Sequence, residues 1–224
     1  MEPDLLGEGL VRRALGADPR LVLLDRGLEG AGASALRTCL VVLGRIAVEH
    51  AAQARPWMAR VLERDLAAHG TLALEAVKQL AEHTAHSTLG DVLGEALERQ
   101  GTPALAGILD DVGLPEESVM LRRVTEWVTR TLLAALPDRQ DEATQAERAR
   151  LLNNLGHFQS ALGHREAALA SAEESVRIRR ALAKSRPDAY LPGLASSLNN
   201  LGRSQSELGL REAALASAEE SVQH

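Results

Sequence analysis

Aromatic side chains are scarce in this chain, making up 2% of its 224 residues, whereas hydrophobic residues make up 45%. The apolar residues are therefore mainly Leu, Ala and Val, a mixture that favours helices over strands. A chain of this length can bury most of its apolar surface in one large domain or two small ones. The composition predicts an all-α protein.

Positive charge is also in short supply, because 25 Lys and Arg residues oppose 31 Asp and Glu residues, for a net charge of -6. This balance disfavours a general surface for nucleic acid or anionic membranes. The acidic start "MEPDLLGEG" lacks a signal-peptide pattern, and no apolar run approaches the roughly 18 residues that span a bilayer. We expect a cytoplasmic protein that binds neither nucleic acid nor membrane.

Residues for catalysis or metal binding are few. Cys39 is the single cysteine, so no internal disulfide can form, and its apolar neighbours predict a small buried side chain. His83 and His86 have the spacing of one helical face, but no further ligands complete a metal site. No G-x-S-x-G motif or local triad pattern is present. The sequence predicts no enzyme activity, metal or cofactor.

One segment has part of the spacing of a phosphate-binding loop. In "GLEGAGAS", residues 27–34, three of the four fixed positions match, but Ala33 stands where the loop needs lysine. "LAGILDD", residues 105–111, could supply an acidic pair for magnesium, and a degenerate NTPase would then require a parallel sheet. The surrounding sequence is poor in strand-forming residues. We predict instead a turn between helices at 27–34 and a short helix between Pro103 and Gly113.

An internal repeat is the strongest signal in the chain. "LNNLG" occurs from residue 152 and from residue 198, and "REAALASAEESV" occurs from residue 165 and, identically, from residue 211, so both pairs are offset by 46 positions. In each unit, apolar residues at helical spacing are followed by a glycine, Gly163 or Gly209, suited to ending a helix. A second helix with small Ala residues follows. Each unit is therefore predicted to be a helical hairpin.

These residues resemble the tetratricopeptide repeat. The consensus positions are occupied by Leu152, Leu155, Gly156, Leu162, Gly163 and Ala168, and by Leu198, Leu201, Gly202, Leu208, Gly209 and Ala214. The period exceeds the usual 34 residues, and the excess in "RIRRALAKSRPDAYLPG" is similar to that of kinesin-light-chain repeats. We expect it to lengthen the second helix and to add a proline-bearing connection.

The resemblance implies a groove that is lined by the first helix of each unit and binds a peptide. Carried onto this chain, the main groove residues are Asn153, Asn154, His157, Asn199, Asn200 and Arg203, and further positions are Arg150, Ser160, Ser196 and Ser206. A side-chain amide can bond a peptide backbone through both its donor and its acceptor. The alternative is that duplication retained these asparagines for helix packing.

Residues 1–137 are predicted to form an N-terminal domain of seven or eight helices, and residues 138–224 two repeats, making the whole an α-solenoid of helical hairpins. The boundary lies in the polar stretch 137–148, whose later half could already be helical. The basic run Arg177–Arg180 is predicted to be solvated helix surface, although it could attract an acidic peptide.

The second repeat ends at "SVQH", where the first continues, so we expect an apolar face to be left bare, as in a fragment of a longer array. Our leading hypothesis is a non-enzymatic scaffold that binds a protein or peptide, with self-association through the repeat ends also open. The alternative is a sensor or linker from a larger bacterial signalling ATPase of the STAND type, since similar arrays often follow a nucleotide-binding module there.

Overall fold

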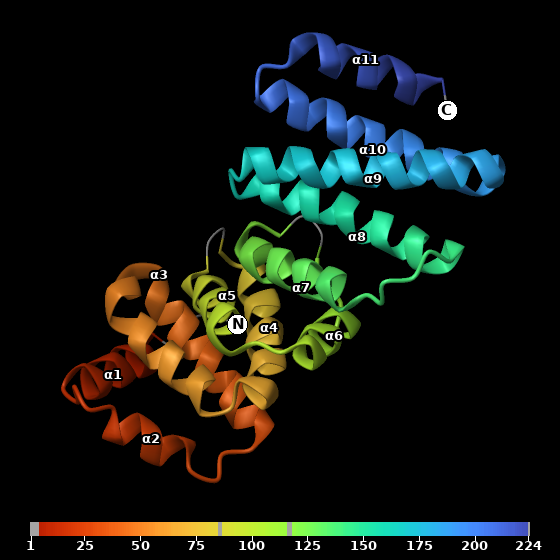
Figure 1. The fold of residues 1–224 in the computed structure, drawn as a ribbon. Coiled ribbons are helices and arrows are strands. Elements are labelled where there is room, and N and C mark those ends of the chain that lie inside the picture. The colour runs from red at the N-terminus through yellow and green to blue at the C-terminus, as the bar shows by residue number, and fades with distance from the viewer. Residues whose placement is uncertain (1–4, 85–86, 116–117, 224) are drawn as a thin grey trace. The chain divides into compact units, whose positions relative to one another are not determined.

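The computed structural model describes residues 5–84, 87–115 and 118–223, and within them the chain forms helices and no β-strand (Figure 1). The all-α prediction is confirmed. The hypothesis of a degenerate NTPase is wrong for the described residues, because it required a parallel sheet. The chain divides into two compact units, residues 1–127 and 128–224. The boundary between these units lies inside a helix and precedes residue 137, the predicted end of the N-terminal domain.

The first unit is built from consecutive helices of very different lengths. In order these are α1 (Leu5–Gly16), α2 (Val22–Leu28), α3 (Ala33–Arg64), α4 (Leu66–Ala81), α5 (Thr88–Gln100), α6 (Pro103–Asp111) and the 3₁₀-helix η1 (Val119–Leu121). Helix α7 (Arg122–Ala135) begins in this unit and ends in the second. The predicted number of seven or eight helices agrees with the described part of the chain.

The glycine-rich segment 27–34 connects two helices, as predicted. Gly27 lies inside α2, Gly30 adopts the left-handed region at φ 71°, and Gly32 directly precedes α3. The predicted short helix at Pro103 is also confirmed. Thr102 accepts a hydrogen bond from the backbone N–H of Leu105 at its start, and Gly113, at φ 84°, follows its end.

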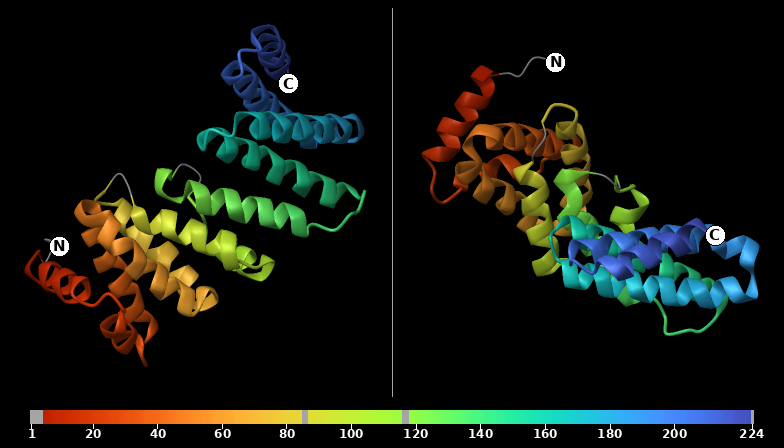
Figure 2. Two further views of the ribbon diagram at one scale, coloured as in Figure 1. Left: turned by 60° about the vertical axis from the view of Figure 1, so that its left-hand side comes forward. Right: turned by 90° about the horizontal axis from the view of Figure 1, so that it is seen from above.

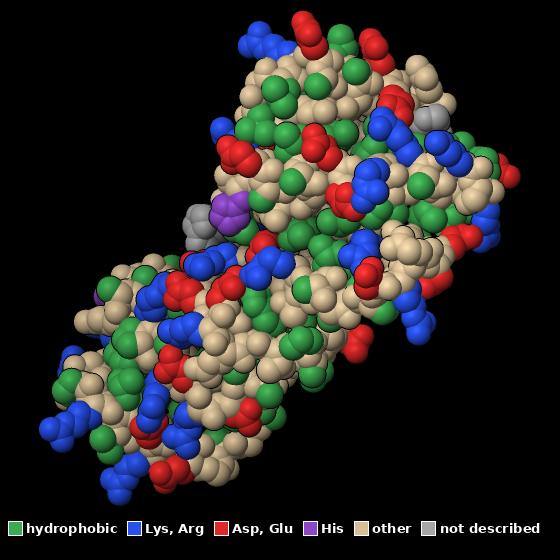
Figure 3. Space-filling model, in the orientation of Figure 1, with side chains coloured by type: hydrophobic (Ala, Val, Ile, Leu, Met, Phe, Trp, Pro, Cys, Tyr) green, Lys and Arg blue, Asp and Glu red, His purple; other side chains and the backbone are tan. Residues whose placement is uncertain are grey.

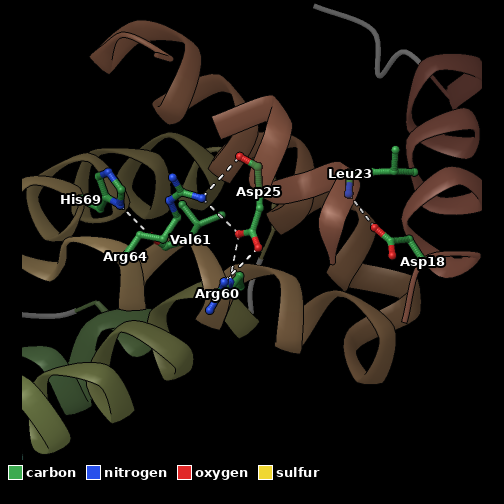
Figure 4. Close-up of polar contacts among 7 residues, drawn as sticks. All are labelled: Asp18, Leu23, Asp25, Arg60, Val61, Arg64 and His69. Atoms are coloured by element: carbon green, nitrogen blue, oxygen red, sulfur yellow. Dashed lines mark hydrogen bonds and ion pairs between the residues drawn. The ribbon is translucent and has the colours of Figure 1, made fainter. Parts of the chain in front are cut away.

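Helix α3 is the longest element and carries much of the first unit's core. Its helical path is interrupted at His50, and Pro56, which cannot donate a backbone hydrogen bond, lies one to two turns later. On α2, the Asp25 carboxylate accepts two hydrogen bonds from Arg60, at 2.9 and 3.0 Å, and one from Arg64 at 3.1 Å, and the backbone oxygen of Asp25 accepts another from Arg64 at 3.3 Å (Figure 4). Ion pairs therefore join the short α2 to the long α3.

The second unit consists of antiparallel hairpins. Its helices are α8 (Glu142–Ala161), α9 (Arg165–Ser185), α10 (Pro187–Glu207) and α11 (Arg211–Val222), and they pack in chain order, as the left view in Figure 2 shows. Asp141 caps α8 by accepting from the N–H of Thr144, so the later half of the polar stretch is helical, as expected.

Glycines shape both hairpins at corresponding places. Gly163 and Gly209 end α8 and α10 in the left-handed region, at φ 81° and 77°, as predicted. A Cβ built on Gly156 would lie 3.2 Å from the backbone oxygen of Ala168, and one on Gly202 would lie 3.3 Å from that of Ala214. The two helices of each hairpin thus touch backbone to backbone at one point.

The extra length of the repeat is divided between two helices. Helix α9 continues to Ser185, as predicted, but only Arg186 separates it from α10. The expected proline-bearing connection is wrong, because Pro187 opens α10 and Pro192 lies inside it. Proline is well tolerated in the first turn of a helix, where the missing N–H would have no partner in any case.

Candidate functional site

Four of the six main predicted groove residues lie where α8 and α10 meet. The side-chain oxygen of Asn153 on α8 accepts two hydrogen bonds from α10, one from the Asn200 amide and one from the Ser197 hydroxyl, both at 3.0 Å. These bonds link the first helix of one repeat to the first helix of the next. They engage the oxygen of Asn153, whereas its amide nitrogen can donate elsewhere.

Two fully buried serines extend this contact to α9. Ser175 on α9 lies 2.8 Å from the backbone oxygen of Ala149 on α8 and 2.9 Å from the hydroxyl of Ser197. The two hydroxyls have one proton each, yet they make three contacts with Ala149, Asn153 and each other. Their protons are therefore shared among alternative bonds, and three helices are held by one polar cluster.

Further along the same helices, His157 lies 2.9 Å from Arg203, and the Ser160 hydroxyl donates to the Glu207 carboxylate at 2.7–2.8 Å. We call the whole set the polar seam. Its members are Asn153, His157 and Ser160 on α8, Ser175 on α9, and Ser197, Asn200, Arg203 and Glu207 on α10. It joins the two repeats along several turns of helix.

The structure separates the six predicted groove residues into three groups. Asn153 bonds Asn200, and His157 contacts Arg203, so four of them belong to the polar seam. Asn199 contacts α11 rather than α8, because its side-chain oxygen accepts a hydrogen bond from the Ser221 hydroxyl at 2.9 Å. Asn154 is half-buried on α8 and is not a member of the seam. Of the six, Asn199 and Arg203 are exposed.

The sequence analysis did not single out the serines of α9 and α11. Ser171 donates to Gln159 within the first hairpin at 2.8 Å, and Ser217 donates to Gln205 in the second at the same distance. The signal for them was present, because the "SAEES" segment recurs in both units with two serines one helical turn apart. Polar residues repeated on an otherwise apolar helix face indicate packing contacts.

A surface groove of about 680 Å³ lies between α9 and α11, over α10. Its lining includes Val176, Leu201 and Ala213 as well as basic residues from the predicted Arg177–Arg180 run. Arg180 donates to the Glu220 carboxylate across it, with one bond at 3.0 Å. The prediction of solvated surface therefore holds for Arg177 and Arg180, which are largely exposed. It is wrong for Ile178, which is buried, and Arg179 is half-buried and donates to the backbone oxygen of Gly193.

The first unit offers little for catalysis. Burial raises the pKa of the half-buried Cys39 thiol above its ordinary value, which disfavours the reactive thiolate. His83 follows α4 in a turn, so the expected helical pairing with His86 is wrong for His83, and His86 lies outside the described residues. A pocket of about 540 Å³ is lined by both His50 and His83. No metal-binding group of three ligands occurs in the described residues.

Residues 149–182 match the family described as tetratricopeptide repeat, a range that covers most of α8 and α9. The match supports a protein of this repeat type, a class of generally non-enzymatic scaffolds for protein–protein interaction. No curated protein and no solved structure matches the chain. Among the described helices, none is long and apolar enough to cross a bilayer.

Proposed function

We propose that this chain is a non-enzymatic scaffold that holds a peptide or an extended protein segment against the face of α8 and α10 along the polar seam. The observation that carries the proposal is the alignment of partly exposed amides and charged groups on the first helices of adjacent repeats. These are Asn153, Asn200, His157 and Arg203, with the exposed Asn199 beside them.

The polar seam suits the backbone of a bound peptide because its side chains have donors and acceptors that their bonds to one another do not use. A carboxamide offers two donors and an acceptor, so Asn153 can still donate and Asn200 can still accept. Arg203 has five N–H donors and uses one in its contact with His157. A peptide laid across these groups would gain hydrogen bonds to a surface already held in place, which reduces the entropy lost on binding.

The long helices of this repeat make kinesin-light-chain repeats the best analogy for the array. Both α9 and α10 have 21 residues, so adjacent helices contact each other over more turns. Extended helix contacts favour a rigid array, and a rigid surface preserves the spacing of Asn153 and Asn200 along the seam.

Photo-crosslinking tests this proposal without disturbing the internal bonds of Asn153. A photoreactive residue is placed at Arg203 or Ser206, both exposed on α10, and as a matched control at Glu173, exposed on α9. After irradiation in extract from the native host, we expect a discrete protein or peptide adduct from the α10 positions alone.

The double variant Asn153→Ala/Asn199→Ala completes the test. If it retains its helical circular dichroism but loses the adduct, the seam is the binding surface. Equal adducts from position 173, or none from either α10 position, would rule out ligand binding along the seam.

A further inference from the structure

The first unit contains a pocket that peptide binding along the polar seam does not use. It lies between α1, the middle of α3 and the turn that follows α4. Its volume of about 540 Å³ is within the range of sites that bind small molecules. All of its lining residues belong to the first unit and precede the two repeats, so the pocket is complete within one compact unit.

The interruption of α3 at His50 shapes this pocket. Successive residues of a regular helix are rotated by about 100°, so Val48 and His50 would lie roughly 200° apart, on nearly opposite sides of the axis. Both nevertheless line the pocket. The backbone at His50 leaves the helical region, with φ −128° and ψ 45°, which breaks the regular spacing and accounts for their shared position. One helix therefore supplies an apolar and a polar side chain to the same site.

Arg12 differs from two other half-buried arginines of the first unit in having no acidic partner. Basic and acidic side chains alternate over the face of this unit that Figure 3 shows. Arg45 pairs with Glu8 at 3.4 Å, and Arg55 pairs with Glu95. No described residue forms an ion pair or hydrogen bond with the Arg12 side chain. Because a cation partly withdrawn from water is unfavourable without a partner, an anionic ligand would stabilise Arg12.

The remaining polar groups of the pocket favour an anion with a single charge. No described residue forms a hydrogen bond with the imidazoles of His50 and His83, and each imidazole can donate an N–H even in its neutral form. Glu49 is exposed, and its carboxylate would repel a second negative charge on the ligand. Water and salt weaken the effect of Glu49 more than that of the half-buried Arg12. This balance favours a carboxylate over a phosphate dianion.

The pocket also has an apolar wall on α3. Ile46 is buried, whereas Val48 is 59% exposed, so a ligand with an apolar body would cover a hydrophobic side chain that water now contacts. We propose that the pocket binds a small organic monocarboxylate, whose carboxylate pairs with Arg12 and accepts hydrogen bonds from His50 and His83 while its apolar body covers Val48. This binding does not depend on peptide binding along the polar seam.

Octanoate and phenylacetate serve as probes, because they share the carboxylate and differ in their apolar bodies. Octylamine and octyl phosphate carry the octyl chain with a positive charge and with a phosphate group. Isothermal titration calorimetry measures their affinities for the full chain, and NMR of the histidine side chains locates the site. We expect saturable binding of the carboxylates with shifts in the His50 and His83 resonances. Octylamine and octyl phosphate should bind at least about tenfold more weakly than octanoate.

Two neighbouring arginines of α1 form a matched pair of variants. Arg12→Gln and Arg13→Gln each remove one positive charge, but Arg13 is exposed and does not line the pocket. We expect Arg12→Gln to weaken octanoate binding at least about tenfold and Arg13→Gln to leave it within about twofold. Glu49→Gln should strengthen the binding of octyl phosphate more than that of octanoate, because it removes the repulsion of a second charge. Circular dichroism confirms that the variants keep their helical content.

Three results would overturn the proposal. The first is absence of saturable binding by both carboxylates. The second is equal affinity of Arg12→Gln and Arg13→Gln for octanoate, or binding without shifts at His50 and His83, because the carboxylate would then bind elsewhere. The third is binding of octylamine as tight as that of octanoate, because contact with the octyl chain alone would then account for the affinity.

Discussion

The α8–α9 and α10–α11 hairpins have closely related sequences but different surroundings. In the first, Leu133 of α7 packs on one side and α10 covers the other. In the second, α10 is covered on its α9 side, whereas Leu215, Ala218 and Val222 of α11 are exposed in the described chain. Identical residues thus range from fully buried to almost fully exposed, which shows that their contribution to stability depends on the neighbouring helix rather than on the local sequence.

The most severe test replaces the same valine in both copies. Val176→Asp buries an unpaired charge and should destabilise the second unit by about 3–5 kcal/mol, whereas Val222→Asp should change the free energy of unfolding by about 0.5 kcal/mol or less. Urea unfolding monitored by circular dichroism measures both. Similar losses would mean that Val222 is buried in solution, for example in a dimer, and sedimentation velocity would reveal that state.

A smaller difference is expected at the glycines where the helices touch. Gly156→Ala and Gly202→Ala each place a methyl group 3.2–3.3 Å from a backbone oxygen, which should cost about 1–3 kcal/mol. The cost should be lower at Gly202, because none of the described helices covers Leu215 and Val222 of α11, so that α11 can move away more easily than α9. Thermal unfolding of both variants checks the order. The control is Gly107→Ala, at a half-buried position in α6 with no heavy atom within 4 Å of the added Cβ.

The asparagines extend the comparison to hydrogen bonds. Asn153→Ala removes two bonds to α10 and should cost about 1–2 kcal/mol, whereas Asn199→Ala removes one bond to Ser221 and should cost about 0.5–1 kcal/mol. Chemical denaturation provides the free energies. A greater loss from Asn199→Ala would contradict the assignment of Asn153 to the central contact between repeats.

The smallest expected effect is electrostatic. The hydrogen bond from Tyr190, followed by that from Arg186, lowers the pKa of Glu142 below its ordinary value of 4.5. Such a carboxylate stabilises the fold above that pH, and the contribution is lost as the pH falls through the folded-state pKa. Tyr190→Phe should therefore raise the pKa of Glu142 in a carbon-detected NMR titration.

The matched control for this titration is Ser196→Ala. Ser196 is exposed on α10, the helix that carries Tyr190, and its replacement should leave the pKa of Glu142 unchanged. The second repeat has Asp188 at the place of Glu142, at the exposed start of α10. An unchanged Glu142 pKa in Tyr190→Phe would assign the shift to Arg186 alone.

The hairpins and their ends could be predicted from the sequence because the signals are local. Gly163 and Gly209 follow apolar helical stripes, and the duplicated segments fix their spacing. The environment of Asn153 could not be predicted in the same way. Helical periodicity shows which side of α8 carries this residue, but its partners Ser197 and Asn200 come from another helix. The helical start at Pro187 was missed because proline also suits a connection.

The identical starts of α9 and α11 also create a problem for folding. Either segment, Arg165–Val176 or Arg211–Val222, has the side chains to pair with α8, so the sequence alone does not select the native partner. Chain connectivity does, because α9 follows α8 after the short turn 162–164, whereas pairing with α11 would close a loop through residue 210. The difference in loop-closure entropy favours the local partner by roughly 2–3 kcal/mol. Gly163, by keeping that turn tight, helps the chain to avoid pairing with the wrong copy of its own sequence.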